Sequence, residues 1–540
     1  MSTTANALGE EEAPLPVVAS PSPEGEDELD NEAILAANED ALQEALVSLE
    51  QEAGEDLDPS SIEGAQAGRA RAASAMTRIF GHFMAEKKPR ATWIVSVLKL
   101  DKDPGANVLR DTIWKRILQV PRFRSVMKVN RFGGYWSELS EEEMLKLRDE
   151  AKYLWSELGE SGEFTKQDVL DTVNGCMEWE YDRHLPLWRC QYVRKMKDGS
   201  ASLIMTINHG VGDGMSLIAT LLGLADSPPD LSKTPYEMAK EAKEARKNQP
   251  APTKPPVRGP KLGSIAKFRS FSYGVFEGTT NSVWKPDAKN SLSMPDVTKP
   301  SSVKRLAEAE PISLDDMKRV KNKFPGATLN DVMMAVMTAT IRAYMLEVGD
   351  PAATNGSVVR GSFPINLRSP HETILRKGDP MNKWSYGTFH FDFKYKSRVD
   401  LVWKVKRQVD KIKVSPSPLL TYRMVGVLSK ALPRRVLLDT ALGVANQGTA
   451  QLSNVPGPSE PIFLAGAKVE DLAFNLFTPV GLYFGLVSYN GRVTASMNVD
   501  GSSACDPKLL AKHWNLEFEA LKQEVEAFGD EPIPVPRYWF

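Results

Sequence analysis

The sequence predicts a mixed α/β fold of two stacked domains with a cleft between them. Three observations lead to this prediction. The chain has 540 residues, well above the ~100–200 residues of a usual single domain. Apolar strand patterns alternate with helical patterns in both halves of the chain. A proline-rich stretch at residues 248–261 separates the two halves and is typical of an extended linker.

The first 68 residues form an acidic tail. They contain 18 Asp and Glu residues and no Lys or Arg, so the remaining chain has 67 basic against 52 acidic residues, a net charge of +15. Such a tail is predicted to be largely disordered, although residues 32–52 have helical spacing and could fold on a partner. The start of the chain lacks the basic and apolar regions of a signal peptide. The basic body is expected to attract anions such as phosphorylated cofactors or anionic lipid headgroups, and no nucleic-acid-binding motif is evident.

The cysteines and the apolar runs exclude several classes of protein. Cys176, Cys190 and Cys505 are scattered and odd in number, which argues against a disulfide framework and against a zinc site. The uncharged run at residues 472–491 has membrane-spanning length, but Pro, Gly and Asn residues interrupt it. We therefore expect two buried strands there rather than a transmembrane helix.

The first predicted domain covers residues 69–228 and alternates helices and strands. Helices are predicted at residues 72–83, 111–118 and 141–158, and strands at residues 92–100, 188–195 and 203–207.

Residues 229–305 are predicted to be a basic, proline-rich linker with some helical structure. A basic helix is expected at residues 234–247. Residues 264–278 mix Phe and Tyr with Lys and Arg. Such a segment could lie on a membrane surface or could pack on its own domain.

The second predicted domain covers residues 306–540. Ser313 and Thr328 are expected to begin helices, the second of which is long and runs over residues 332–346. Further helices are predicted at residues 401–413, 418–432 and 507–528. Strands are predicted at residues 358–364, 384–393, 452–455, 474–477, 483–489 and 494–499, the last four in one sheet.

The strongest candidate site is the loop at residues 208–214, Asn-His-Gly-Val-Gly-Asp-Gly, which joins a buried strand to an apolar helix. Glycines in the loop allow tight or positive-φ backbone geometry. His209 would be held rigidly at the mouth of this strand–loop–helix unit, and imidazole can take a proton from an alcohol near neutral pH. Asp213 is placed to brace the loop. A lone histidine in a loop is, however, more often only solvated.

Three further motifs have both functional and structural interpretations. Pro186-Leu187-Trp188 could line a channel or simply be a turn with a core tryptophan. Asn330-Asp331 could support the site or cap a helix. His184 is a second candidate base, although a surface position is the more common one for such a residue.

In order and spacing, these segments are similar to the wax ester synthase/diacylglycerol acyltransferase (WS/DGAT) family of acyl-CoA-dependent O-acyltransferases. The loop at residues 208–214 resembles the family's H-H-x-x-x-D-G motif, residues 186–188 its P-L-W motif, and residues 330–331 its N-D motif. Residues 364–368, 453–458 and 486–491 are similar to further family segments. The resemblance runs from about residue 75 to about residue 525 apart from the linker.

The resemblance implies two chloramphenicol-acetyltransferase-like domains with the active site at their interface. His209 would be the general base that deprotonates the acceptor hydroxyl for attack on the thioester. Asp213 would be structural and pair with an arginine, for which Arg183 and Arg189 are the candidates. Asn208, Gly214, Pro186, Leu187, Trp188, Asn330 and Asp331 would support the motif. No metal and no cofactor is implied beyond acyl-CoA as co-substrate.

Asn208 departs from the family motif, which has a histidine there. Because an amide still donates and accepts hydrogen bonds, activity is expected to survive. Two alternatives stay open: a catalytically impaired homologue that binds lipids or acts as a scaffold, and a related acyltransferase for soluble acceptors. The latter class would need a D-F-G-W-G motif, which this chain lacks. The expected partners are acyl-CoA, a fatty alcohol or diacylglycerol, and a membrane or lipid-droplet surface, with the endoplasmic reticulum as the expected location.

Overall fold

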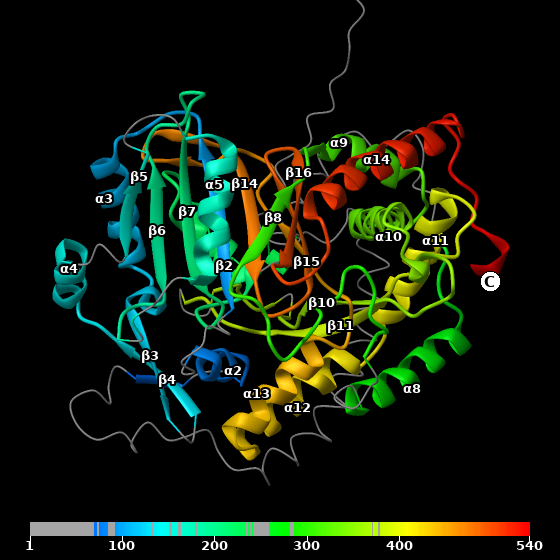
Figure 1. Ribbon diagram of the computed structural model, residues 1–540, viewed down its shortest axis with the longest axis horizontal. Helices are drawn as coiled ribbons and strands as arrows, with labels where there is room; N and C mark the ends of the chain where they lie inside the picture. The colour runs from blue at the N-terminus through cyan, green and yellow to red at the C-terminus, as the bar shows by residue number, and fades with distance from the viewer. Residues whose placement is uncertain are drawn as a thin grey trace, which may run out of the picture.

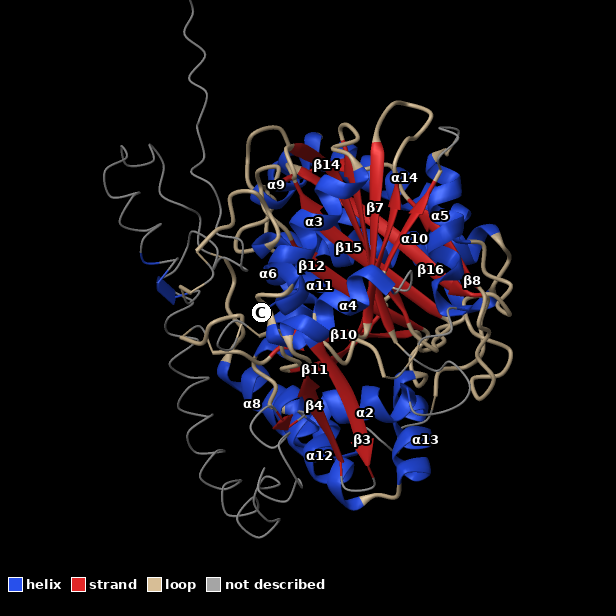
Figure 2. Ribbon diagram, turned by 90° about the vertical axis from the view of Figure 1, so that its left-hand side faces the viewer, coloured by secondary structure: helices blue, strands red, loops and turns tan. Residues whose placement is uncertain are grey.

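The computed structural model describes most of the chain after residue 69. The described residues are 70–72, 75–84, 92–130, 133–150, 154–159, 164–178, 182, 184–230, 232–233, 236–237, 240, 259–280, 286–369, 371–375 and 379–539. The acidic tail, nearly all of the predicted helix at residues 234–247 and most of the proline-rich stretch lie outside them. Figures 1 and 2 show helices packed on the outer sides of two central sheets.

The N-terminal half contains the alternating elements that the sequence predicts, with four additional strands and a helix. Its helices are α2 (Ala75–Met84), α3 (Ala106–Ile117), α4 (Glu141–Glu150), α5 (Lys166–Asn174) and α6 (Gly214–Gly223), with short 3₁₀ turns η3 (Pro121–Arg124) and η4 (Gly175–Glu178). Its strands are β1 (Ala70–Ala72), β2 (Trp93–Leu100), β3 (Ser125–Asn130), β4 (Gly133–Glu138), β5 (Trp155–Leu158), β6 (Trp188–Val193) and β7 (Ala201–Asn208).

One helix in this half is shorter than predicted. The helix expected over residues 141–158 ends at Glu150, and Trp155–Leu158 is a strand that pairs in parallel with β6. Pairing with a neighbouring strand overrides local periodicity, because strand preference depends on packing partners that the sequence window does not contain.

The C-terminal half begins with α8 (Ser264–Thr280). Its other helices are α9 (Leu314–Asn322), α10 (Leu329–Glu347), α11 (Arg398–Lys413), α12 (Ser417–Ala431), α13 (Arg434–Ala445) and α14 (Pro507–Glu526), with η6 (Pro351–Ala353) and η7 (Arg537–Trp539). Its strands are β8 (Lys304–Glu308), β9 (Ile312–Ser313), β10 (Arg360–Asn366), β11 (Trp384–His390), β12 (Ala450–Pro456), β13 (Phe463–Leu464), β14 (Ala467–Phe477), β15 (Leu482–Tyr489) and β16 (Arg492–Asp500). All helices predicted here are confirmed, whereas α8, α13, β8, β9 and β13 were not predicted.

The N-terminal sheet contains two strands from the C-terminal half. The C-terminal sheet has the order β11-β10-β12-β15-β16-β8, with β9 also paired to β16. The other has the order β13-β14-β2-β7-β6-β5, so a hairpin from the C-terminal half completes the N-terminal sheet. The prediction that residues 474–477 share a sheet with residues 483–489 is therefore wrong, because β14 pairs along its length with β2. A small third sheet has the order β1-β4-β3.

Each large sheet has its own apolar core. Buried side chains of β2, β6 and β7 pack with α3, including Trp114 and Trp188. In the C-terminal half, side chains of β12, β15 and β16 pack with α10, α11 and α14. A smaller cluster joins α2 and α13 to Trp384 of β11. This third cluster places a helix from near the start of the described chain beside the C-terminal sheet.

The segment at residues 264–278 is the helix α8, which packs against α12 and α11 at the edge of the molecule (Figures 1 and 2). Among the helices that are described, none has the length and apolar character needed to cross a membrane. The run at residues 472–491 forms parts of β14 and β15, as predicted.

Candidate active site

His209 lies where β7 ends and the loop to α6 begins. Its backbone N–H donates to the Thr92 carbonyl (2.9 Å), which continues the pairing of β7 with β2. The loop is tightly packed at Gly212, where a Cβ atom would lie 2.8 Å from Cβ of Pro380. Gly212 does not have a positive φ. It is therefore needed for close approach of the chain rather than for an unusual backbone conformation.

The His209 imidazole is enclosed by aromatic rings. The Phe80 ring of α2 stacks on it with centroids 4.5 Å apart, and Trp384 of β11 lies 5.6 Å away. His209 is only 7% exposed, and its Nδ1 makes no hydrogen bond with the described residues. Burial lowers the pKa of His209, and the charge of Asp213 opposes this shift. Burial therefore favours the neutral imidazole, the form that can accept a proton.

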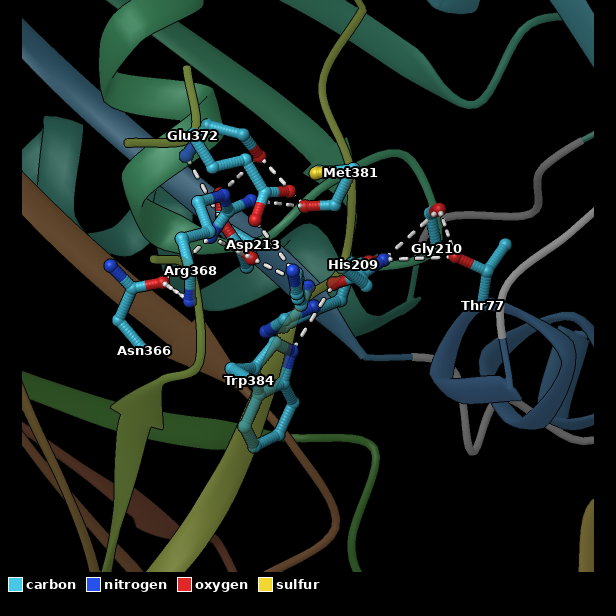
Figure 3. A network of polar contacts seen from close by, with 12 residues as sticks. Thr77, His209, Gly210, Asp213, Asn366, Arg368, Glu372, Met381 and Trp384 are labelled. Carbon is cyan, nitrogen blue, oxygen red and sulfur yellow. Dashed lines mark hydrogen bonds and ion pairs between the residues drawn. The ribbon is translucent and has the colours of Figure 1, made fainter. Parts of the chain in front are cut away.

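Asp213 pairs with Arg368, which lies just beyond β10 in the C-terminal half (Figure 3). Oδ2 of Asp213 is 2.9 Å from Nη1 of Arg368, and both side chains are buried. The predicted partner Arg189 is wrong, since its side chain instead approaches Sγ of Cys176, and Arg183 lies outside the described residues. Oδ1 of Asp213 accepts from the Ser216 N–H and caps α6. Both carboxylate oxygens thus serve structure, in agreement with the expected structural role.

The segment before β11 is hydrogen-bonded to this loop. The Met381 carbonyl accepts from the Asp213 N–H (3.1 Å) and from Nη2 of Arg368 (3.1 Å). The Lys383 N–H donates to Oδ2 of Asp213 (3.0 Å). Arg368 also donates to Oδ1 of Asn366 (3.1 Å). Two loops of the C-terminal half therefore fix the conformation of a loop in the N-terminal half.

Asn382 contacts His209 from the same segment. Its Nδ2 lies 2.8 Å from the His209 carbonyl, 3.3 Å from the Gly210 carbonyl and 3.1 Å from Oγ1 of Thr77. Its Oδ1 accepts from Nε1 of Trp384 (3.3 Å). One buried amide thus joins α2, the histidine loop and β11.

Asn208, which replaces the first histidine of the family motif, is fully buried and closes the turn. Its Oδ1 accepts from the Gly210 N–H (2.9 Å), and its Nδ2 donates to the Thr92 carbonyl (3.2 Å). The side chain therefore supports the backbone on which His209 sits.

We expect Asn208→Ala to lower the free energy of unfolding by about 1–3 kcal/mol, because the Gly210 N–H would be left buried without its acceptor. Chemical denaturation of both proteins measures this difference. Asn107→Ala, at an exposed position of α3, is the matched control and should change stability little. Equal stability of Asn208→Ala and the unchanged protein would contradict a supporting role for Asn208.

The Pro186-Leu187-Trp188 motif is part of the core beneath the loop. Trp188 is fully buried, packs on Trp114, and donates from Nε1 to the Phe123 carbonyl (2.7 Å). The Leu187 carbonyl accepts from the Asn208 N–H (2.9 Å). The motif thus acts on the site through the backbone of β7.

Asn330 and Asp331 lie at the start of α10. Oδ2 of Asp331 accepts from the Thr328 N–H (2.8 Å) and completes a capping box. Burial raises the pKa of Asp331. The Asn330 side chain contacts Asn454 of β12 (Oδ1 to Nδ2, 3.4 Å). The helix-cap interpretation is confirmed, and the polar contacts of this pair are with Thr328 and Asn454 rather than with His209.

The two remaining candidates, His184 and Gly214, lie in different surroundings. His184 is exposed, as expected for a surface residue, and its N–H donates to Asp182. Gly214 begins α6, where a Cβ would lie 3.4 Å from Cγ2 of Val455. The segment at residues 453–458 therefore lies beside the histidine loop.

Sequence reasoning missed the residues that surround the loop from elsewhere in the chain. Arg368 lies within a segment that resembles the family, and its positive charge could have marked it as a partner for Asp213. Asn382, Trp384 and Phe80 carried no such signal, because an amide and two aromatic rings are common in any core. Only the packing of β11 and α2 against the loop reveals them.

Comparison with known proteins identifies the family. The model of the wax ester synthase/diacylglycerol acyltransferase catalytic domain matches residues 162–333, and that of the WS/DGAT C-terminal domain matches residues 381–522. The chain belongs to the WS/DGAT family. Relatives in this family are named as acyltransferases, and the chain is accordingly an acyltransferase.

Among the relatives, wax ester synthase/diacylglycerol acyltransferase 5 from Arabidopsis thaliana is 24% identical over 490 residues, covering 80% of this chain and 90% of the relative. Wax ester synthase/diacylglycerol acyltransferase 4 from the same plant is 23% identical over 387 residues, covering 66% and 73%. A putative diacylglycerol O-acyltransferase from Mycobacterium tuberculosis is 24% identical, covering 69% and 76%.

Solved structures show the same fold. A wax ester synthase/diacylglycerol acyltransferase from Marinobacter aquaeolei matches with a TM-score of 0.53 at 17% identity, covering 84% of this chain and 99% of that structure. A trichothecene 15-O-acetyltransferase from Fusarium sporotrichioides matches with a TM-score of 0.57 at 11% identity, covering 87% and 99%. The expected two-domain, chloramphenicol-acetyltransferase-like fold is thereby confirmed.

Proposed function

We propose that this WS/DGAT-family acyltransferase moves the acyl group of a long-chain acyl-CoA to the hydroxyl of a long-chain alcohol or a diacylglycerol. The products would be wax ester or triacylglycerol. The observation that carries the proposal is a buried His209 on a loop whose carboxylate, Asp213, is bound by Arg368 from the other half. The names of the family and of the relatives support the two classes of acceptor.

In the proposed reaction His209 accepts the proton of the acceptor hydroxyl as its oxygen attacks the thioester carbonyl carbon. The C–S bond then breaks, and the imidazolium returns the proton to the CoA thiolate. Asp213 takes no proton, because its oxygens are bound by the Ser216 N–H, the Lys383 N–H and Arg368. We propose that no cofactor and no metal is needed and that acyl-CoA acts only as co-substrate.

We further propose that the enzyme works at the surface of a membrane or lipid droplet, on the cytosolic face of the endoplasmic reticulum, because both proposed acceptors are lipids. The positive net charge of residues 69–540 would favour CoA phosphates and anionic headgroups.

The test is CoA release by the purified protein with palmitoyl-CoA as donor and hexadecanol or dioleoylglycerol as separate acceptors. Lipid products are separated by thin-layer chromatography. Formation of either ester supports the proposal and shows which acceptor is preferred. Absence of both esters, also after Asn208→His, would contradict it.

The pH dependence follows from the buried position of His209. Burial lowers the pKa of His209 from the ordinary 6.5. We therefore expect kcat/KM to decline on the acid side with a midpoint below pH 6.5, as His209 becomes protonated. A pH series of kcat/KM measures this. An acid limb with its midpoint at or above pH 6.5 would contradict the assignment.

A further inference from the structure

The solvent-facing side of α8 carries large apolar side chains. Ile265 is 78% exposed, Phe268 is 71% exposed and Phe276 is 57% exposed. At 3.6 residues per turn these positions fall on one side of the helix, together with the exposed Arg269. Soluble proteins rarely expose several large apolar side chains in one contiguous patch.

Residues on the other side of α8 show which side of the helix faces the protein. Gly274 is buried, and a Cβ there would collide with Oγ of Ser415, so the helix backbone approaches the protein closely. The Glu277 side chain hydrogen-bonds Thr388 and Ser417. Gly274 and Glu277 thus face the protein, whereas the large apolar side chains of Ile265 and Phe268 face out. An ordinary surface helix turns such side chains inward.

Positive charges lie beside this apolar side. Lys411 of α11, the helix that packs on α8, has its pKa lowered by burial and by the charges of Arg407 and Arg269. Arg407 and Arg269 therefore each lie close enough to Lys411 for their charges to act on it. An apolar side flanked by cations complements a surface that offers acyl chains and anionic headgroups together.

We propose that the α8 surface, defined as Ile265, Phe268, Phe276, Arg269, Arg407 and Lys411, docks on an anionic lipid bilayer. The apolar side chains enter the boundary between headgroups and acyl chains, and the cations contact lipid phosphates. This inference rests on the part of the proposed function that places the enzyme at a lipid surface. It names the helix that contacts that surface. Both views of the molecule place α8 at its edge, where a bilayer can reach it (Figures 1 and 2).

Co-sedimentation with vesicles tests the inference. The full chain is mixed with vesicles of phosphatidylcholine and phosphatidylserine, and the bound fraction is measured. We expect the double variant Ile265→Glu/Phe268→Glu to bind at least about 10-fold more weakly, because both glutamates would have to enter the interface. The matched control is Leu516→Glu, at a 52% exposed apolar position on α14, which lies away from α8. It should bind like the unchanged protein.

A second arm tests the charges. Arg269→Gln should weaken binding to the anionic vesicles, and salt should do the same, since Coulomb attraction to headgroups is screened. Vesicles of phosphatidylcholine alone should bind the protein less than the mixed vesicles.

Three outcomes would overturn the inference. They are no binding of the unchanged protein to anionic vesicles, equal binding by the double variant, or a dimer of the unchanged protein in analytical ultracentrifugation that is absent in the double variant.

Circular dichroism establishes that the variants are folded. His209→Ala should bind vesicles normally while losing activity, and the α8 variant should release CoA normally with detergent-dispersed hexadecanol. Failure of docking is thereby distinguished from failure of the proposed catalysis.

Discussion

His209→Ala is expected to lower the rate of CoA release by about 10²–10⁴-fold, the usual range for loss of a general base. The loop should keep its conformation, because the hydrogen bonds at this position are made by the backbone: the His209 N–H to Thr92 and the His209 carbonyl to Asn382. Steady-state kinetics with palmitoyl-CoA and the preferred acceptor measure the effect. We expect the loss in kcat rather than in KM for acyl-CoA.

His184→Ala is the matched control, since His184 is exposed and contacts Asp182 through its backbone N–H, which the substitution retains. It should retain full activity. If His209→Ala kept more than about a tenth of the activity, the general-base assignment would be wrong.

Arg368→Met is expected to have the largest effect on stability, a loss of about 3–5 kcal/mol in the free energy of unfolding, because it leaves the buried Asp213 carboxylate without its cation. Arg368 also donates to Asn366 and to the Met381 carbonyl, so the variant loses several buried contacts at once. Chemical denaturation of the unchanged and variant proteins measures the loss. Activity should fall with it, since the same contacts hold the loop that carries His209.

The double variant Asp213→Asn/Arg368→Met separates charge from packing. The uncharged side chain that Asp213→Asn introduces can still cap α6, so the double variant should be more stable than Arg368→Met alone. Arg368→Lys should be intermediate, because an ammonium cannot reproduce the fork of the guanidinium. If Arg368→Met unfolds like the unchanged protein, the ion pair does not stabilise the interface between the halves.

Much of the local structure around the site was predictable from the sequence. An apolar run at residues 203–207, a glycine-rich break from Asn208 and a new apolar pattern after Gly214 predicted the strand, the loop and the helix that the structure contains. Thr328 and Asp331 predicted a helix start and form a capping box. These predictions succeeded because hydrogen bonding in caps and apolar periodicity depend on residues close in sequence.

The errors arose where strands pair with partners far away in the chain. Residues 155–158 form a strand because they pair with β6, and β14 of the C-terminal half pairs with β2 of the N-terminal half. Nothing in a local window distinguishes these strands from a helix end or from a strand of the nearer sheet. Their assignment depends on which sheet edge is available.

The sequence by itself determined the residues of the candidate loop: His209, the proposed base; Asp213, which caps α6; and the glycines that let the loop fold tightly. Only the tertiary structure decided what surrounds them. Arg368 neutralises Asp213, Asn382 binds the His209 carbonyl, and Phe80 and Trp384 enclose the imidazole. The physical reason is distance along the chain. These contacts join residues that lie far apart in sequence, and burial and charge pairing over such separations exist only once the two halves have packed together.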